Sequence, residues 1–229
     1  MARRSEDLIK ALAADAVPVR RLASPMLRLA LWVAASAAYT AIIVGIMGLR
    51  PDLPTRLTDA RFVLELGATF MTSVLAAAAA FCAGCPGRPI WERFAPVPAL
   101  ALWFFSLGEG CWLEQGGAQG LQFRLDFVCF PSIVLVSIVP AALILIMIRR
   151  GAPIAPVTTT ALGTLAAAAL GATALRLFHA QDASLMILVW QFGAVALLAG
   201  FGALIGRHVL PWPEARVAVR PAGSPGTGT

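Results

Sequence analysis

Long hydrophobic runs alternate with short polar segments along this chain. A helix needs about 20 apolar residues to cross the roughly 30 Å hydrocarbon core of a bilayer, and six runs approach or exceed that length. We predict membrane-spanning helices at about 27–49, 62–83, 91–108, 127–148, 156–175 and 183–206. The pattern therefore indicates an all-α, polytopic membrane protein with six transmembrane helices in a lipid bilayer.

The composition agrees with this interpretation. Hydrophobic residues make up 59% of the 229 residues and charged residues only 13%, with a mean hydropathy of +0.80. A water-soluble domain is much less apolar. The 18 Lys and Arg residues outnumber the 12 Asp and Glu residues, but they lie between the hydrophobic runs rather than on one segment. We therefore expect no direct nucleic-acid partner.

The basic residues also predict an orientation. Thirteen of the 18 fall on one side of the predicted membrane and five on the other. Because cytoplasmic segments carry the excess of Lys and Arg, the first side, which includes both termini, is predicted to be cytoplasmic. This divides the chain into a cytoplasmic tail at 1–25, a six-helix transmembrane domain at 26–208 and a second cytoplasmic tail at 209–229. The Pro- and Gly-rich composition of the second tail predicts disorder.

The tail at 1–25 has the pattern of a short amphipathic helix. Ser5 is a suitable N-cap, and Pro18 stops the helical run. Between them, Leu8, Ile9 and Leu12 recur along one helical face. A helix of about 12 residues is marginal alone in water. We expect it to be ordered against a protein partner or against the inner leaflet, and the pattern favours neither.

The polar segment at 108–131 is predicted to be the longest loop outside the cytoplasm. It contains Cys111 and Cys129, which can form a disulfide in an oxidising compartment, and closing such a loop contributes roughly 3 kcal/mol to stability. The same pair can instead act as a reversible thiol pair or a thiophilic-metal site. Both roles stay open at this point. Secondary candidate metal ligands on the same side are Glu109, His179 and Asp182.

Two further polar groups occur at the ends of predicted spans. Arg61 and Glu65 are four residues apart and could pair on one helix face, although anchoring of the helix end at the interface is the interpretation we prefer. Cys82 and Cys85 form a Cys-x-x-Cys pattern at a predicted cytoplasmic surface, where thiols are kept reduced. One such pair lacks the four ligands of a structural zinc site, and we interpret these cysteines as incidental.

Residues suited to catalysis are scarce. The two histidines fall at span ends on opposite sides, and the centres of the predicted spans lack Asp, Glu, Lys and Arg. We therefore predict no catalytic residue, no cofactor and no enzyme activity. The alternatives are a quinone-linked membrane thiol oxidoreductase, because the chain has two cysteine pairs, and a small transporter. The oxidoreductase needs both pairs within exchange distance, which the predicted topology opposes.

Several segments together resemble the NrsF family of six-span bacterial inner-membrane anti-sigma factors. They are EDLIKALAADAVPVRRL in the tail, LRPDL and DARF outside, PGR and RRGAP inside, and RLFHAQDASLMILVW before and within the last span. The resemblance extends from Glu6 to about Arg207. It implies a protein of the bacterial inner membrane with both termini in the cytoplasm.

The resemblance also implies a partner and a signal. In the family the N-terminal segment binds an extracytoplasmic-function (ECF) sigma factor of RNA polymerase, which favours a protein partner for the tail. Cys111 and Cys129 match by position a cysteine pair that is tied to heavy-metal or oxidative stress. The oligomeric state is left open. The sigma-binding residues that the resemblance implies are Asp7, Leu8, Ile9, Leu12, Asp15, Arg20 and Arg21.

Overall fold

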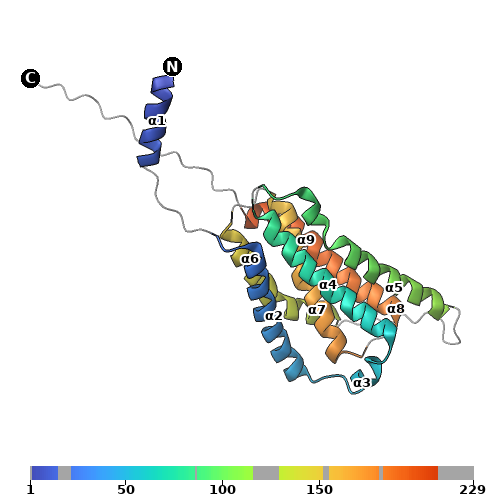
Figure 1. The fold of residues 1–229 in the computed structure, drawn as a ribbon. Coiled ribbons are helices and arrows are strands. Elements are labelled where there is room, and N and C mark those ends of the chain that lie inside the picture. The colour runs from blue at the N-terminus through green and yellow to red at the C-terminus, as the bar shows by residue number, and fades with distance from the viewer. Residues whose placement is uncertain are drawn as a thin grey trace, which may run out of the picture.

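The computed structural model describes residues 2–14, 22–85, 87–115, 129–151, 155–180 and 183–210 (Figure 1). Regular structure in these residues is helical, with no strand among them. Six helices in this part of the chain are long and apolar enough to cross a membrane. The predicted all-α fold with six transmembrane helices is therefore confirmed.

The long helices follow one another in chain order. The first three are α2 (Pro25–Met47), α4 (Ala60–Ala83) and α5 (Val97–Gln115), the last of which follows the 3-10 helix η1 (Ile90–Phe94). The other three are α6 (Cys129–Arg149), α7 (Pro156–Phe178) and a continuous run of α8 (Ser184–Met186), the π-helix η2 (Ile187–Phe192) and α9 (Gly193–Val209). The shorter helices α1 (Ala2–Ala14) and α3 (Leu53–Arg56) precede α2 and α4.

Contacts between helix termini define two ends of the bundle. At the end where α2 begins, here called the proximal end, the Arg28 guanidinium donates to the carbonyl oxygen of Met147 near the end of α6. At the opposite or distal end, the Arg50 N–H donates to the carbonyl oxygen of Leu177 at 3.0 Å. The long helices lie side by side between these two ends (Figure 1), as a chain that crosses a bilayer repeatedly requires.

Small residues allow the central helices to approach closely. α7 packs against α4, α6 and α9 and is the most buried of the long helices. A Cβ added at Gly171 of α7 would lie 2.8 Å from the Ile133 carbonyl oxygen, and one at Gly206 of α9 would lie 2.9 Å from the Pro156 carbonyl oxygen. Both positions therefore need glycine, as is usual where membrane helices pack tightly.

Local predictions at three places are wrong. Ser5 does not cap the N-terminal helix, because α1 already begins at Ala2. The segment at 108–131 is not a loop throughout, because α5 continues to Gln115 and α6 begins at Cys129. Arg176, which follows the end of the span predicted at about 156–175, lies in the last turn of α7. In each case the helix continues beyond the apolar run, because polar residues such as Glu and Arg also favour helices. Residues 116–128 and 211–229 lie outside the described part of the chain.

Candidate functional site

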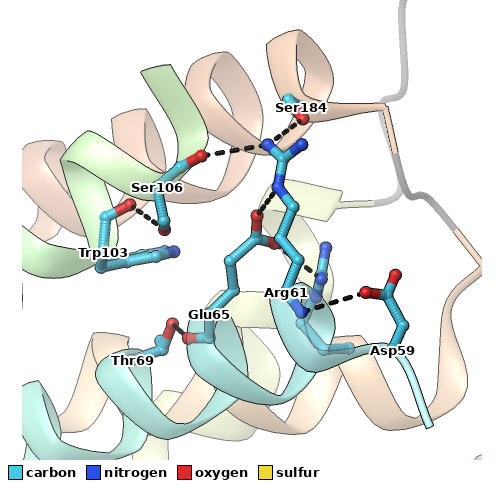
Figure 2. A network of polar contacts seen from close by, with 8 residues as sticks. Asp59, Arg61, Glu65, Thr69, Trp103, Ser106 and Ser184 are labelled. Carbon is cyan, nitrogen blue, oxygen red and sulfur yellow. Dashed lines mark hydrogen bonds and ion pairs between the residues drawn. The ribbon is translucent and has the colours of Figure 1, made fainter. Parts of the chain in front are cut away.

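A buried ion cluster occupies the distal end of the bundle (Figure 2). Its centre is Glu65 of α4, which is 4% exposed. The Glu65 carboxylate accepts hydrogen bonds from Arg61 Nε at 3.1 Å and from Arg176 Nη2 of α7 at 2.9 Å. These three residues are called the distal ion cluster below. The pairing of Arg61 with Glu65 is therefore found, and the burial of Glu65 goes against simple anchoring at the interface.

Arg61 also connects α4 to two other helices. Its Nη2 donates to the Ser106 carbonyl oxygen of α5 at 3.0 Å and to Ser184 Oγ of α8 at 2.9 Å (Figure 2). Gly110 of α5 makes room for the guanidinium, since a Cβ there would lie 1.2 Å from Arg61 Nη2. One side chain thus fixes α4, α5 and α8 relative to one another. Its guanidinium packs against Gly110, which immediately precedes Cys111.

Cations around one aromatic ring fasten the loop between α2 and α4. Arg176 Cζ lies 4.7 Å and Arg50 Cζ 5.7 Å from the centroid of the Phe62 ring, both within the range of cation–π contacts. Arg50 is buried and donates to the two carboxylate oxygens of Asp52 at 2.7 and 2.8 Å. These hydrogen bonds hold the pKa of the Asp52 carboxyl well below its usual range.

The predicted sensing residues, Cys111 and Cys129, lie at this same end. Cys129 is the first residue of α6, is 2% exposed, and belongs to a buried cluster that includes Leu107 and Leu175. Cys111 is half-buried and follows Leu107 by four residues, so it lies on the same face of α5. The structure therefore brings both cysteines to the neighbourhood of the distal ion cluster.

The apolar stripe of the N-terminal tail is uncovered by the described part of the chain. The side chains of Leu8, Ile9 and Leu12 on α1 are 60%, 64% and 64% exposed. Asp7 lies on the same helix and is also exposed. The remaining residues predicted to bind a sigma factor, Asp15, Arg20 and Arg21, lie outside the described residues.

The secondary metal ligands do not form a metal centre within the described residues. Glu109 is exposed on α5. His179 ends α7, where its backbone N–H donates to the Leu175 carbonyl oxygen at 2.8 Å. Asp182 lies outside the described residues. Metal binding by this set stays a prediction.

Three residues of the site escaped the sequence analysis: Arg176, Ser184 and Gly110. A signal for Arg176 was present, because Glu65 and Arg176 border apolar runs and ionisable residues in such positions usually pair with one another. No pattern in the sequence indicates a role for Gly110. Its role depends on the guanidinium of another helix lying against it, and a contact between helices cannot be predicted from residue spacing along one helix.

Comparisons with known proteins identify one family. No curated protein and no solved structure matches the chain significantly. The model of the NrsF family, described as negative regulator of sigma F, matches residues 12–212, which is most of the chain. The chain therefore belongs to the NrsF family of negative regulators of sigma F.

Proposed function

We propose that this negative regulator is a membrane-bound anti-sigma factor that sequesters an ECF-type sigma factor through its N-terminal tail. It releases the sigma factor when a heavy-metal or oxidative signal outside the cytoplasm acts on Cys111 and Cys129. Both termini face the cytoplasm of the bacterial inner membrane, and the protein is not an enzyme. The observation that carries the proposal is the uncovered apolar face of α1 in a chain whose family regulates a sigma factor.

The surface of α1 is of the kind that binds in the groove of a protein partner. Leu8, Ile9 and Leu12 lie on one side of the helix, and full burial of each side chain contributes about 1.5–3 kcal/mol before the cost of ordering the helix. The helix has 13 residues, so the interface is small. A modest change in how the tail is presented is then sufficient to release the partner.

Co-purification of the sigma factor tests the docking role. The Leu8→Asp, Leu12→Asp double variant puts two carboxylates on the apolar stripe and should no longer retain the sigma factor. Lys10→Gln, Ala14→Asp is the matched control, because it lowers the net charge by the same two units on the other side of α1, where both residues are exposed. Retention by the control and loss by the stripe variant is expected. Retention by both variants contradicts docking through this face.

The distal ion cluster offers a route by which Cys111 chemistry acts on the bundle. Cys111 directly follows Gly110, which packs against the Arg61 guanidinium. A new bond to the Cys111 sulfur that moves the end of α5 therefore displaces the guanidinium and breaks its hydrogen bonds to α5 and α8. Because Arg61 and Arg176 share Glu65, the disturbance extends to α7.

Replacement of both cysteines tests the sensing role. The Cys111→Ser, Cys129→Ser variant should keep the sigma factor bound while a sigma-dependent reporter stops responding to heavy metal or oxidant. Leu113→Ser serves as the control, since it places the same hydroxyl at an exposed position two residues farther along α5. Its reporter should respond as the wild type does. A normal stress response in the double cysteine variant contradicts sensing by this pair.

The charge at the two ends of the bundle supports the proposed orientation. The proximal end includes Arg28, Arg88, Arg93, Arg149, Arg150 and Arg207, and the distal end includes Arg50, Arg56, Arg61 and Arg176. The richer end faces the cytoplasm by the positive-inside rule. A fluorescent protein that folds only in the cytoplasm should fluoresce when fused to either terminus. Fluorescence at one terminus alone, or at neither, contradicts the orientation.

A further inference from the structure

The other cysteine pair, at the proximal end, takes no part in the proposed function. Cys82 lies in the last turn of α4, and the N–H of Cys85 donates to the Cys82 carbonyl oxygen at 3.0 Å. Residues three apart in such a turn are neighbours, with Cβ atoms about 5–6 Å apart. The two sulfur atoms can therefore bind one small ligand between them.

Polar contacts and a small cavity surround these thiols. Arg88 Nη2 donates to Cys82 Sγ at 3.6 Å, and the same guanidinium pairs with Glu92 at 2.7 Å. The Cys85 thiol donates to the Phe81 carbonyl oxygen at 3.5 Å. Both cysteines, Arg88 and Glu92 line a cavity of about 10 Å³, which has room for a single water-sized particle.

A buried arginine beside the pair has no carboxylate partner among the described residues. Arg28 is 4% exposed, donates to the Met147 carbonyl oxygen, and lies with its Cζ 4.7 Å from the centroid of the Phe81 ring. Its Nη1 makes no hydrogen bond to any described residue. The Cys85 thiol donates to the carbonyl oxygen of this same Phe81, so the guanidinium and the thiol contact one residue. Because a buried cation without a full set of partners is costly, negative charge at the cysteine pair would stabilise this end of the bundle.

We infer that Cys82 and Cys85 form a binding site for a soft monovalent metal cation of the Cu(I) class. Thiolates are the ligands that such ions prefer, and two sulfur atoms in a nearly linear arrangement suffice for a d10 cation. Binding forms two S–Cu bonds and breaks two S–H bonds, both protons pass to solvent, and no oxidation state changes. The bis-thiolate complex carries a single net negative charge, which Arg28 and Arg88 stabilise.

Two other uses of the pair agree less well with these observations. A structural zinc site needs four ligands, and within the described residues no group of three or more His, Cys, Asp or Glu side chains could hold a metal. A disulfide between Cys82 and Cys85 would be uncharged and would leave the Arg28 guanidinium without an anion. The copper site goes beyond the proposed function and does not depend on it.

Uptake of Cu(I) by the purified full-length protein tests the inference. The protein is kept in detergent without oxygen and without thiol reductants, and Cu(I) is supplied as a complex with a chromophoric chelator. The Cys111→Ser, Cys129→Ser variant retains only the proximal pair and should take one Cu(I) per chain from the chelator. Adding Cys82→Ser and Cys85→Ser should abolish this uptake. Equal uptake by the two variants, or no uptake by either, overturns the inference.

A milder substitution keeps the test decisive if the variant without cysteines folds poorly. Cys85 is half-buried, so Cys85→Ser alone, in the Cys111→Ser, Cys129→Ser background, disturbs packing little but leaves one sulfur. Circular dichroism and gel filtration should show an unchanged fold, while Cu(I) is lost to the chelator. Retention of Cu(I) by this variant overturns the two-sulfur site.

Discussion

Replacement of Glu65 by glutamine is the sharpest perturbation of the distal ion cluster. Glutamine has nearly the shape of glutamate, so the change removes negative charge without opening a cavity. The Glu65 carboxylate is buried and accepts hydrogen bonds from Arg61 and Arg176. In the variant, two guanidinium groups lose the carboxylate between them. We therefore expect a large loss of stability from a change that leaves packing almost intact.

The exposure of the two arginines sets the size of this loss. Removing one partner of a buried ion pair costs about 3–5 kcal/mol, whereas an exposed pair contributes less than about 1 kcal/mol. The Arg176 side chain is 5% exposed and gains little from water, while that of Arg61 is 33% exposed and is partly solvated. The cost is therefore set mainly by the buried pair with Arg176. Because the glutamine oxygen still accepts a hydrogen bond, we expect the lower end of this range, roughly 3 kcal/mol. For a chain of this length, that corresponds to a fall in Tm of about 6–12 °C.

Thermal unfolding in detergent, followed by helical circular dichroism, measures this fall. Glu109→Gln is the matched control, because Glu109 is an exposed carboxylate on α5 and its neutralisation should cost less than about 0.5 kcal/mol. The double variant Glu65→Gln, Arg61→Gln should lose less than the sum of the two single changes, since both remove the same hydrogen bond. If Glu65→Gln and Glu109→Gln unfold at the same temperature, the reasoning from burial is refuted.

Three further predictions concern glycines and pH. Gly110→Ala should displace the guanidinium packed against it and cost about 1.5–3 kcal/mol in lost hydrogen bonds, whereas Gly108→Ala, with no atom within 4 Å of its new Cβ, should not lower Tm. Gly171→Ala should cost about 1–3 kcal/mol, because its Cβ would meet a backbone oxygen of α6 at 2.8 Å. A Tm equal to that of Gly108→Ala contradicts either claim. Hydrogen bonds from Arg50 lower the pKa of the Asp52 carboxyl. This pairing therefore stabilises the fold above the usual carboxyl pKa of about 3.9, and the stabilisation is lost as the pH falls below that value. The Tm difference between wild type and Asp52→Asn should thus be constant above about pH 5 and shrink on further acidification. A Tm difference that is the same at every pH contradicts the pairing.

Hydropathy is sufficient to predict the six helices. A helix needs about 20 apolar residues to cross the bilayer. Because the hydrocarbon core contains no water, the backbone N–H and C=O groups must form their hydrogen bonds within the helix, so the apolar runs and the helices coincide. Hydropathy fails where a helix continues into polar sequence. α5 extends through Glu109 to Gln115, and Glu favours helices although it is polar. For this reason the helical placement of Cys111 could not be predicted from the apolar run.

Spacing along the chain predicts contacts within one helix but not between helices. The four-residue spacing of Arg61 and Glu65 indicates their ion pair. The second partner of Glu65, Arg176, is 111 residues away in sequence, and only the packing of α4 against α7 brings the two together. The space for the Arg61 guanidinium over Gly110 likewise follows from the packing of α5 beside α4. The candidate site is thus a product of tertiary structure, although the charged residues that form it are visible in the sequence.

α4 is the element that can couple the two ends of this protein. It carries Glu65 at the distal end and Phe81 at the proximal end, where the Phe81 ring lies beneath the Arg28 guanidinium of α2. Between these positions α4 packs against α7 through small buried side chains, and such close packing transmits a displacement rather than absorbing it. In the proposed regulator, a signal acts only if it favours one position of α4 over another. A change in the position of α4 would then alter the contact between Phe81 and Arg28. Because the tail that we propose to bind the sigma factor precedes α2 in the chain, Arg28 in the first turn of α2 is the contact through which a movement of the bundle would change the tail.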